Sequence, residues 1–181
     1  MSGRDGLRGG IKLTKIYEDD KQFEERTNKL HYPLLKEYFA RDPNNPVEVV
    51  EIQDRTLQFK GIDLELHSRD GGTLQVELKT DRHVLSPNLF LEDVSNSQTG
   101  TLGWTLKCEA DVLSYGFLNE RLPTILTRQY LYDMMSLRQW YKTHREAYRQ
   151  CQIPNKGYFT IGRPVPITDL EFFLIIKQEI S

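Results

Sequence analysis

Two segments of alternating apolar and polar residues, joined by a glycine-containing turn, constrain the fold of this chain more than any other feature. The first spans residues 57–66, with a slip of one residue at Gly61, and the second spans residues 74–79. Residues 68–72, Ser-Arg-Asp-Gly-Gly, connect them and tolerate the positive φ angles of a tight turn. Because alternate side chains of a strand share a face, the pattern predicts a β-hairpin with one buried face and one polar face. The slip at Gly61 indicates a β-bulge.

The other periodicities predict an α/β fold around this hairpin. Apolar residues recur at steps of three and four over residues 17–39 and again over residues 129–149, which is the spacing of one helix face. Pro33 interrupts the first of these helices. We expect further strands at residues 47–52, 110–115, 124–126 and 158–161, a polar, turn-rich connection at residues 87–103, and a short last helix capped by Thr168. This order of elements predicts a mixed central sheet flanked by helices.

Composition limits the class of protein. A length of 181 residues suits one domain, and 38% hydrophobic residues exclude a disordered chain. No apolar run approaches the roughly 20 residues that span a bilayer, and the N-terminus lacks the apolar stretch of a signal peptide. Two cysteines, Cys108 and Cys151, are too few for a disulfide framework, so we expect free thiols and a cytoplasmic protein with no membrane partner. Glycine and basic residues at positions 1–15 predict a flexible basic arm ahead of a single domain at residues 16–181.

The polar face of the predicted hairpin gathers acidic and basic side chains. If the apolar rows of both strands face one core, Asp63 and Glu65 of the first strand and Glu77 and Lys79 of the second meet on the opposite face. Cross-strand neighbours lie about 5 Å apart, which suits two carboxylates that hold one divalent cation. Such a cation activates water for phosphodiester hydrolysis, and an ammonium group beside it stabilises the developing charge. A Glu-x-Lys pair also occurs on many strands as a solvated face with weak ion pairs.

The sequences Gly61-Ile-Asp63 and Glu77-Leu-Lys79, with Phe23-Glu24 on the first predicted helix, resemble the motifs of the PD-(D/E)xK nuclease superfamily. The resemblance implies a restriction-endonuclease-like α-β-β-β-α-β core, and the predicted elements follow that order from about residue 17 to residue 116. The chain differs from the family pattern in two places. Ile62 replaces the proline of the motif, and a long connection follows the lysine.

The same resemblance implies a role for each matching residue. Asp63 and Glu77 would be ligands of Mg²⁺ or Mn²⁺, and Lys79 would be the catalytic lysine. A glutamate of the first helix often joins the metal site in this superfamily. That role maps best onto Glu24, with Glu25 as the competing choice, because only one of two adjacent helical positions can face the site.

Basic and aromatic residues elsewhere are candidates for DNA contact. Arg138, Lys142, Arg145 and Arg149 follow one another at steps of four, three and four, which places them on one stripe of the second long helix. Such a stripe matches phosphate spacing, although a basic stripe is more often a solvated face. Further candidates are Trp104, Lys107 and His83, which follow Lys79 in the sequence. The net charge of −2 excludes a protein whose whole surface is a polycation.

These features together predict a Mg²⁺- or Mn²⁺-dependent DNA endonuclease. We expect a homo-oligomer, in the simplest case a dimer, because both strands of a duplex must be cut. Two other interpretations stay open at this point. One is a nucleic-acid-binding module that has the fold without the activity, and the other is a structural or partner-binding α/β protein with a solvated, charged hairpin. The intact set of Asp63, Glu77 and Lys79 favours the nuclease.

Overall fold

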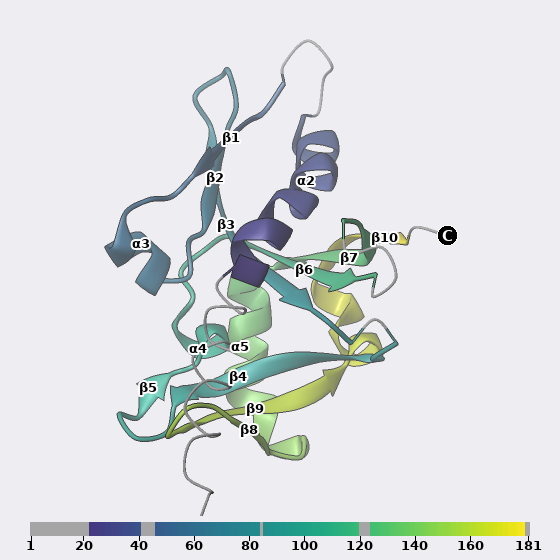
Figure 1. Ribbon diagram of the computed structural model, residues 1–181. Coiled ribbons are helices and arrows are strands. Elements are labelled where there is room, and N and C mark those ends of the chain that lie inside the picture. The colour runs from purple at the N-terminus through teal and green to yellow at the C-terminus, as the bar shows by residue number, and fades with distance from the viewer. Residues whose placement is uncertain (1–21, 41–45, 84, 120–123, 180–181) are drawn as a thin grey trace, which may run out of the picture.

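Two β-sheets and the helices around them make up the described part of the chain (Figure 1). The computed structural model describes residues 22–40, 46–83, 85–119 and 124–179, so the predicted basic arm at residues 1–15 lies outside the described residues. The larger sheet has the strand order β1-β2-β3-β6-β7-β10, and the smaller sheet has the order β5-β4-β9-β8. Within the described residues, no helix is long and apolar enough to cross a membrane.

The larger sheet is mixed, as the sequence predicts. Its β3 and β6 run parallel, and its other neighbouring strands are antiparallel. Strand β3 therefore belongs both to a hairpin with β2 and to a crossover that leads to β6. The strands are β1 (Glu48–Glu51), β2 (Leu64–His67), β3 (Thr73–Asp81), β6 (Val112–Leu118), β7 (Leu126–Asp133) and β10 (Leu174–Glu179).

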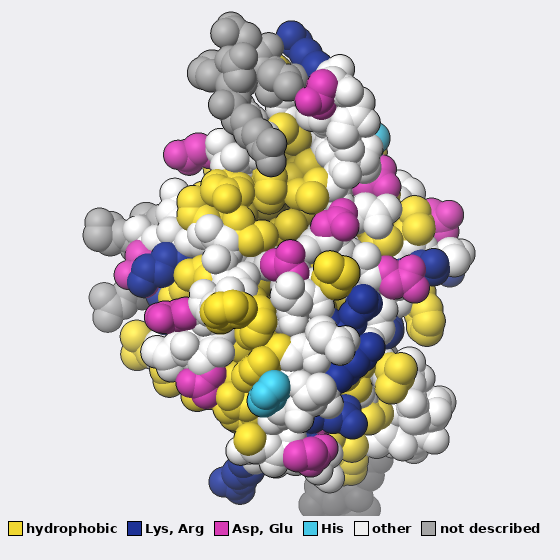
Figure 2. Space-filling view, turned by 180° about the vertical axis from the view of Figure 1, so that it is seen from behind, with side chains coloured by type: hydrophobic (Ala, Val, Ile, Leu, Met, Phe, Trp, Pro, Cys, Tyr) yellow, Lys and Arg dark blue, Asp and Glu magenta, His cyan; other side chains and the backbone are white. Residues whose placement is uncertain are grey.

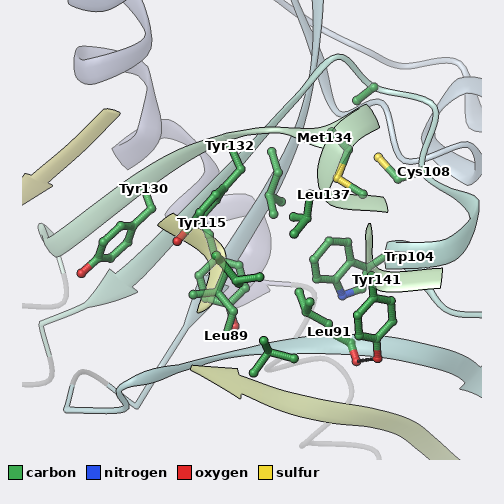
Figure 3. Packing of buried hydrophobic residues seen from close by; sticks show 14 of the residues in the cluster. Leu89, Leu91, Trp104, Cys108, Tyr115, Tyr130, Tyr132, Met134, Leu137 and Tyr141 are labelled. Carbon is green, nitrogen blue, oxygen red and sulfur yellow. Dashed lines mark hydrogen bonds between the residues drawn. The ribbon is translucent and has the colours of Figure 1, made fainter. Parts of the chain in front are cut away.

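Helices cover both faces of this sheet. On one face, Leu34 and Leu35 pack against a cluster that includes Leu78 of β3 and Val112 of β6. On the other face, residues of α4 and α5 join a larger cluster with aromatic side chains of β6 and β7 (Figure 3). Because both faces are covered, the central strands are buried on both sides. The helical elements are residues 22–28, η1 (Lys29–His31), α2 (Tyr32–Phe39), α3 (Arg55–Phe59), α4 (Trp104–Lys107), α5 (Met134–His144), η2 (Arg145–Ala147) and η3 (Ile167–Phe173).

The predicted hairpin forms between β2 and β3. Leu64 lies opposite Val76 and Leu66 opposite Leu74, so the apolar rows face the same core. Gly71, in the turn, has a φ of 87°, which a residue with a side chain rarely adopts. The first predicted helix is interrupted at Pro33, as expected. Pro33 lies in the first turn of α2, directly after a short 3₁₀ segment.

Residues 57–59, at the start of the strand predicted over residues 57–66, belong instead to the helix α3, and a turn follows them. Asp54 caps this helix by accepting the N–H of Thr56 at 2.7 Å. At its other end Gly61 has a φ of 76°, and the N–H groups of Gly61 and Ile62 donate to carbonyl groups of the last helical turn. These paired bonds around a left-handed glycine form a Schellman motif. The slip at Gly61 therefore marks a helix end, and the predicted β-bulge is wrong.

Three further expectations are wrong. Residues 87–103 contain β4 (Asn88–Asn96) and β5 (Thr101–Leu102), which pair with β8 (Cys151–Pro154) and β9 (Phe159–Pro166) to form the smaller sheet. The second long helix begins at Met134, because Asp133 accepts the N–H of Ser136 at 2.7 Å and the preceding residues pair with β6 as β7. The last helical segment, η3, follows Pro166 without a side-chain cap, so Thr168 does not have the predicted role.

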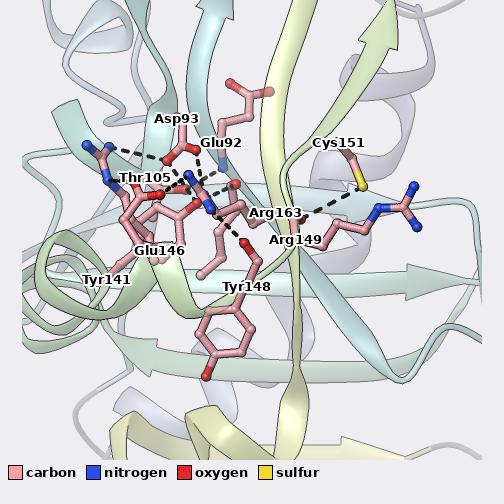
Figure 4. Close-up of polar contacts among 11 residues, drawn as sticks. Glu92, Asp93, Thr105, Tyr141, Glu146, Tyr148, Arg149, Cys151 and Arg163 are labelled. Carbon is pink, nitrogen blue, oxygen red and sulfur yellow. Dashed lines mark hydrogen bonds and ion pairs between the residues drawn. The ribbon is translucent and has the colours of Figure 1, made fainter.

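A buried network of charges attaches the smaller sheet to α5 and η2 (Figure 4). The Asp93 carboxylate on β4 accepts hydrogen bonds from Arg163 Nε on β9 at 2.9 Å and from the Tyr141 hydroxyl on α5 at 3.0 Å. Arg145 Nη1 lies 3.3 Å from the same carboxylate, and Arg163 also donates to Glu146 at 2.9 Å. The side chains of Asp93 and Arg163 are only 7% and 8% exposed. Each buried charge therefore has a charged partner, which burial requires.

We predict that Asp93→Asn lowers the free energy of unfolding by about 3 kcal/mol, because it removes the buried partner of the Arg163 guanidinium and leaves only the exposed Glu146 to compensate its charge. Chemical denaturation followed by circular dichroism measures the loss. Lys177→Met is the matched control, since Lys177 pairs with Glu179 on the surface with both side chains more than half exposed, and such pairs contribute about 1 kcal/mol or less. Equal losses in the two variants would contradict the role of the network.

Candidate active site

A cleft opens where the C-terminal part of β3 leaves the core of the larger sheet and faces the smaller sheet. It encloses about 570 Å³, and its walls come from residues 22–28, β3, β4 and β9. Five of the residues that the sequence singles out line it together: Glu24, Asp63, Lys79, His83 and Trp104. The fold thus brings into one cavity residues that are up to 80 positions apart in the sequence.

The three predicted catalytic residues meet beside this cleft. Asp63 precedes β2, and its Oδ2 accepts the backbone N–H of Leu78 on β3 at 2.8 Å. Glu77 and Lys79 lie on the same side of β3, with Glu77 Oε1 at 2.6 Å from Lys79 Nζ. The Asp63 carboxyl group is also a hydrogen-bond neighbour of Glu77. The predicted clustering of the two carboxylates and the lysine is therefore present in the structure.

The surroundings of this cluster differ from the expected solvated face. Glu77 is only 2% exposed, and its neighbours on that side of the sheet include buried residues of β6. The Lys79 side chain is 31% exposed, and its Nζ lies 5.8 Å from the centre of the Trp104 ring. The cluster therefore begins inside the core at Glu77 and reaches the cleft at Lys79. Weak surface ion pairs do not describe it.

Burial and neighbouring charges shift the pKa values of the pair. Burial raises the pKa of Glu77 to about 7, with Asp63 acting in the same direction and Lys79 opposing it. Burial alone would lower the pKa of Lys79, but the carboxylates of Glu77 and Asp63 outweigh it and hold that pKa above its usual value. The lysine is accordingly charged at neutral pH. A strongly perturbed pair in a cleft is typical of functional sites.

The donor set suits a divalent cation that is completed by substrate and water. Among the described residues, no three histidine, cysteine, aspartate or glutamate side chains form a ready-made metal site. Asp63, at the cleft wall, and the buried Glu77 nevertheless place two carboxyl groups against each other, where a cation would relieve their repulsion. Mg²⁺ typically uses one or two protein carboxylates together with phosphate oxygens and water. The residues present therefore fit such an ion.

The structure separates the two glutamates of the first helix. Glu24 lines the cleft next to Phe23, and its charge contributes to the raised pKa of Lys79. Glu25, one residue further around the helix, is not part of the cleft wall. The position of Glu24 favours it over Glu25 as the helix residue of the site.

The remaining DNA-binding candidates are spread over the molecule. Trp104 lines the cleft but is only 6% exposed, and Lys107 lies outside it, 4.2 Å from the ring of Phe59. The predicted basic stripe, Arg138, Lys142, Arg145 and Arg149, does not border the cleft. Figure 2 shows a row of Lys and Arg side chains over the region of α4 and α5. Two members of this stripe have protein partners, since Arg138 donates to the carbonyl of Cys108 and Arg145 pairs with Asp93. Lys142 and Arg149 are exposed.

Sequence reasoning missed the cleft residues that come from β4. Glu92 lines the cleft, its Oε2 accepts the N–H of Trp104 at 3.4 Å, and burial raises its pKa. Phe90 lines the same wall. A short signal was present in the apolar residues Leu89, Phe90 and Leu91, which lie near the start of β4. Its polar neighbours and the following glycines favoured a turn-rich connection instead.

A buried polar network on the other face of the sheet positions the first helix against β3. His31, which is completely buried, bonds to Ser114 Oγ on β6 at 2.7 Å and to Thr80 Oγ1 on β3 at 3.0 Å. Gln129 on β7 donates to the same Ser114 hydroxyl and to the carbonyl oxygen of His31. Glu24 reaches the cleft from the helical segment that leads into this histidine, so the network holds that segment to the strand of Lys79.

Comparison of the chain with protein-family models, with curated proteins and with solved structures gave no match. The geometry of the cleft is therefore the basis for a functional assignment.

We predict that His31 makes stability fall as the pH drops below about 6.5. Burial, with a contribution from Lys79, lowers the pKa of His31 to about 3, whereas the unfolded chain takes up the proton near pH 6.5. The unfolded state therefore binds more protons between these values, which costs up to about 1.4 kcal/mol per pH unit. Denaturation at pH 7.5, 6.5, 5.5 and 5.0 measures the trend.

In His31→Gln this contribution should disappear, so the difference in stability between parent and variant should shrink as the pH falls. The comparison cancels the opposite contribution of Glu77, whose raised pKa is common to both proteins. His144→Gln, at an exposed position outside the network, is the control. Parallel pH profiles for parent and His31→Gln would show that His31 is not held neutral.

Proposed function

We propose that this protein is a divalent-metal-dependent DNA endonuclease whose catalytic residues are Asp63, Glu77 and Lys79. The observation that carries the proposal is the meeting of two carboxyl groups and a charged lysine beside one cleft, with Glu77 Oε1 2.6 Å from Lys79 Nζ. Phosphodiester hydrolysis needs an activated water and relief of negative charge on the phosphate. This cluster contains the groups for both requirements.

Each residue has a distinct task in this proposal. Asp63 and Glu77 bind Mg²⁺ or Mn²⁺, and the N–H of Leu78 holds the Asp63 carboxylate in place. When bound, the ion would lower the pKa of a coordinated water and polarise a phosphate oxygen. Lys79, at the boundary between core and cleft, orients the attacking water and stabilises the negative charge that grows in the transition state.

The order of elements supports the restriction-endonuclease-like core that the motifs imply. A helix over residues 22–39 is followed by the antiparallel strands β1, β2 and β3 and then, after α4, by β6 parallel to β3. This sequence matches α-β-β-β-α-β, with α3 inserted between β1 and β2, and with β4 and β5 inserted before α4. The insertion explains the long connection after Lys79. The proposal keeps the homo-oligomer expected from the sequence, since many enzymes of the superfamily that cut both strands of a duplex pair two active sites.

Incubation of the protein with plasmid, linear and branched DNA tests the activity directly. We expect cleavage with Mg²⁺ or Mn²⁺ and none with EDTA. Absence of cleavage of every DNA substrate with both metals would refute the nuclease, and DNA binding without cleavage would leave a nucleic-acid-binding module of the same fold.

We predict that Lys79→Met lowers the rate of cleavage by about 10²–10³-fold, the typical effect of removing a group that stabilises transition-state charge. DNA binding should weaken far less than the rate falls, because most of the interaction energy of Lys79 is gained in the transition state. Excess Mn²⁺ should not restore activity, whereas it should partly rescue Asp63→Asn, whose defect is weaker metal occupancy.

Two controls accompany this experiment. Lys177→Met removes an exposed lysine of β10 and should cut DNA at the parent rate. A denaturation curve for Lys79→Met is needed as well, because Glu77 loses its ion-pair partner inside the core. A folded Lys79→Met that cuts at the parent rate would exclude Lys79 from the mechanism.

We predict that Glu24→Gln weakens Mn²⁺ binding by about 10-fold or more, as changes around a metal site typically do. The reason is its place on the cleft wall, within electrostatic reach of Lys79. Glu25→Gln is the matched control, one residue away on the same helix, and should bind Mn²⁺ like the parent. Isothermal titration calorimetry measures both. If Glu25→Gln weakens Mn²⁺ binding and Glu24→Gln does not, Glu25 would be the metal ligand from the helix.

A further inference from the structure

The wall of the cleft that faces Lys79 is one face of the smaller sheet, and it combines apolar side chains with Asn88 and Glu92. On β4, Leu89 and Leu91 point into the core, so Phe90 and Glu92 point to the cleft. Pro164 of β9 and Ile153 of β8 continue the same surface. Phe90, Pro164 and Ile153 thus form a platform of apolar side chains, which we call the β4–β9 platform.

The ring of Phe90 lies directly against the backbone of β9. A Cβ atom at Gly162 would stand 2.6 Å from the ring, so the absence of a side chain at this position makes room for it. The ring is only half-buried, and its open side belongs to the cleft. Phe23, Trp104 and Tyr115 line the other parts of the same cavity. Aromatic side chains therefore surround the space next to the catalytic cluster.

The charges in the cleft are distributed unequally. The side of β3 carries the cations Lys79 and Arg82 together with the carboxylates of Asp63, Asp81 and the nearby Glu24. The Arg82 guanidinium lies 4.0 Å from the ring centre of Phe23. The platform side carries Glu92. With the divalent cation of the proposed function held by Asp63 and Glu77, a phosphate group would be favoured near β3 beside Lys79 and Arg82. Glu92 disfavours a phosphate at the platform, where an uncharged group fits better.

A stacked base pair cannot use such a platform. In a duplex the bases expose their edges in the grooves and hide their faces in the stack. A flat apolar side chain beside the reacting phosphate contacts the face of a base only when that nucleotide has left the stack. A cavity of about 570 Å³ also falls within the size range of sites for small ligands.

We propose that the substrate of this site is an unpaired stretch of DNA, whose base stacks on the β4–β9 platform at Phe90 while its phosphate lies against Lys79. This inference rests on the proposed nuclease function and narrows it to single-stranded segments, such as flaps, gaps and strand ends. Stacking on an aromatic ring tolerates every base, so binding is independent of sequence. The smaller sheet, which carries the platform, therefore selects the structure of the substrate.

Binding of fluorescent oligodeoxythymidine and of a blunt duplex of equal length, in EDTA to prevent cleavage, tests the platform. We expect tighter binding of the single strand. Phe90→Ala should weaken single-strand binding by about 5- to 150-fold, the typical effect of losing one base–aromatic stack, and Phe90→Tyr should retain it. Phe172→Ala, at an aromatic residue of η3 that is 93% exposed, should bind like the parent. Equal binding by Phe90→Ala and the parent would overturn the inference.

Cleavage with Mn²⁺ separates this inference from the proposed function. A blunt duplex and the same duplex with a single-stranded flap serve as substrates, and we expect cleavage in or beside the flap only. Equal cleavage of the two substrates would refute the unpaired substrate and leave the nuclease intact. Tight, Phe90-dependent single-strand binding without any cleavage would refute the nuclease and leave the platform.

Discussion

The burial of Glu77 in the middle of the larger sheet is the constraint on which the candidate site depends. A carboxylate that is 2% exposed needs a partner, since an unpaired charge in the core costs several kcal/mol. Lys79 supplies the partner because residues two apart on a strand share a face, and its Nζ reaches Glu77 at 2.6 Å. Strand β3 thus leads from a buried acid to a charged amine at the cleft. The other walls of the cleft, from residues 22–28, β4 and β9, lie around that amine.

The smaller sheet forms one of these walls. Side chains of β4 point alternately into the buried charge network, which holds the strand in place, and into the cleft. Asp93 points inward, where Arg163, Arg145 and Tyr141 bind it. Its neighbour Glu92 points to the cleft. Because adjacent side chains of a strand lie on opposite faces, a fixed inward row also fixes the outward row. The buried network therefore positions the cleft wall although it does not contact the cavity.

Local rules explain which parts of the fold were predictable. The β2–β3 hairpin follows from a period-two pattern around an Asp-Gly-Gly turn, and the interruption of the first helix follows from Pro33. The predicted strand was wrong over residues 57–62, ahead of β2, because a few alternating residues also fit one turn of helix. The cap at Asp54 and the glycine at position 61 favour the helix there. Strand β4 was not predicted because its partner β9 lies far along the chain, with Asp93 and Arg163 70 positions apart.

The sequence by itself determined that Glu77 and Lys79 share a face and that Asp63 lies near them, because strand alternation and a short turn are local properties. Only the tertiary structure decided that this face is buried, that Glu24 reaches the cleft, and that Glu92 and Phe90 border it. Those outcomes depend on what packs against the hairpin from α4, β4 and the first helix. Burial and long-range charge pairing are set by elements distant in the chain, and no local pattern encodes them.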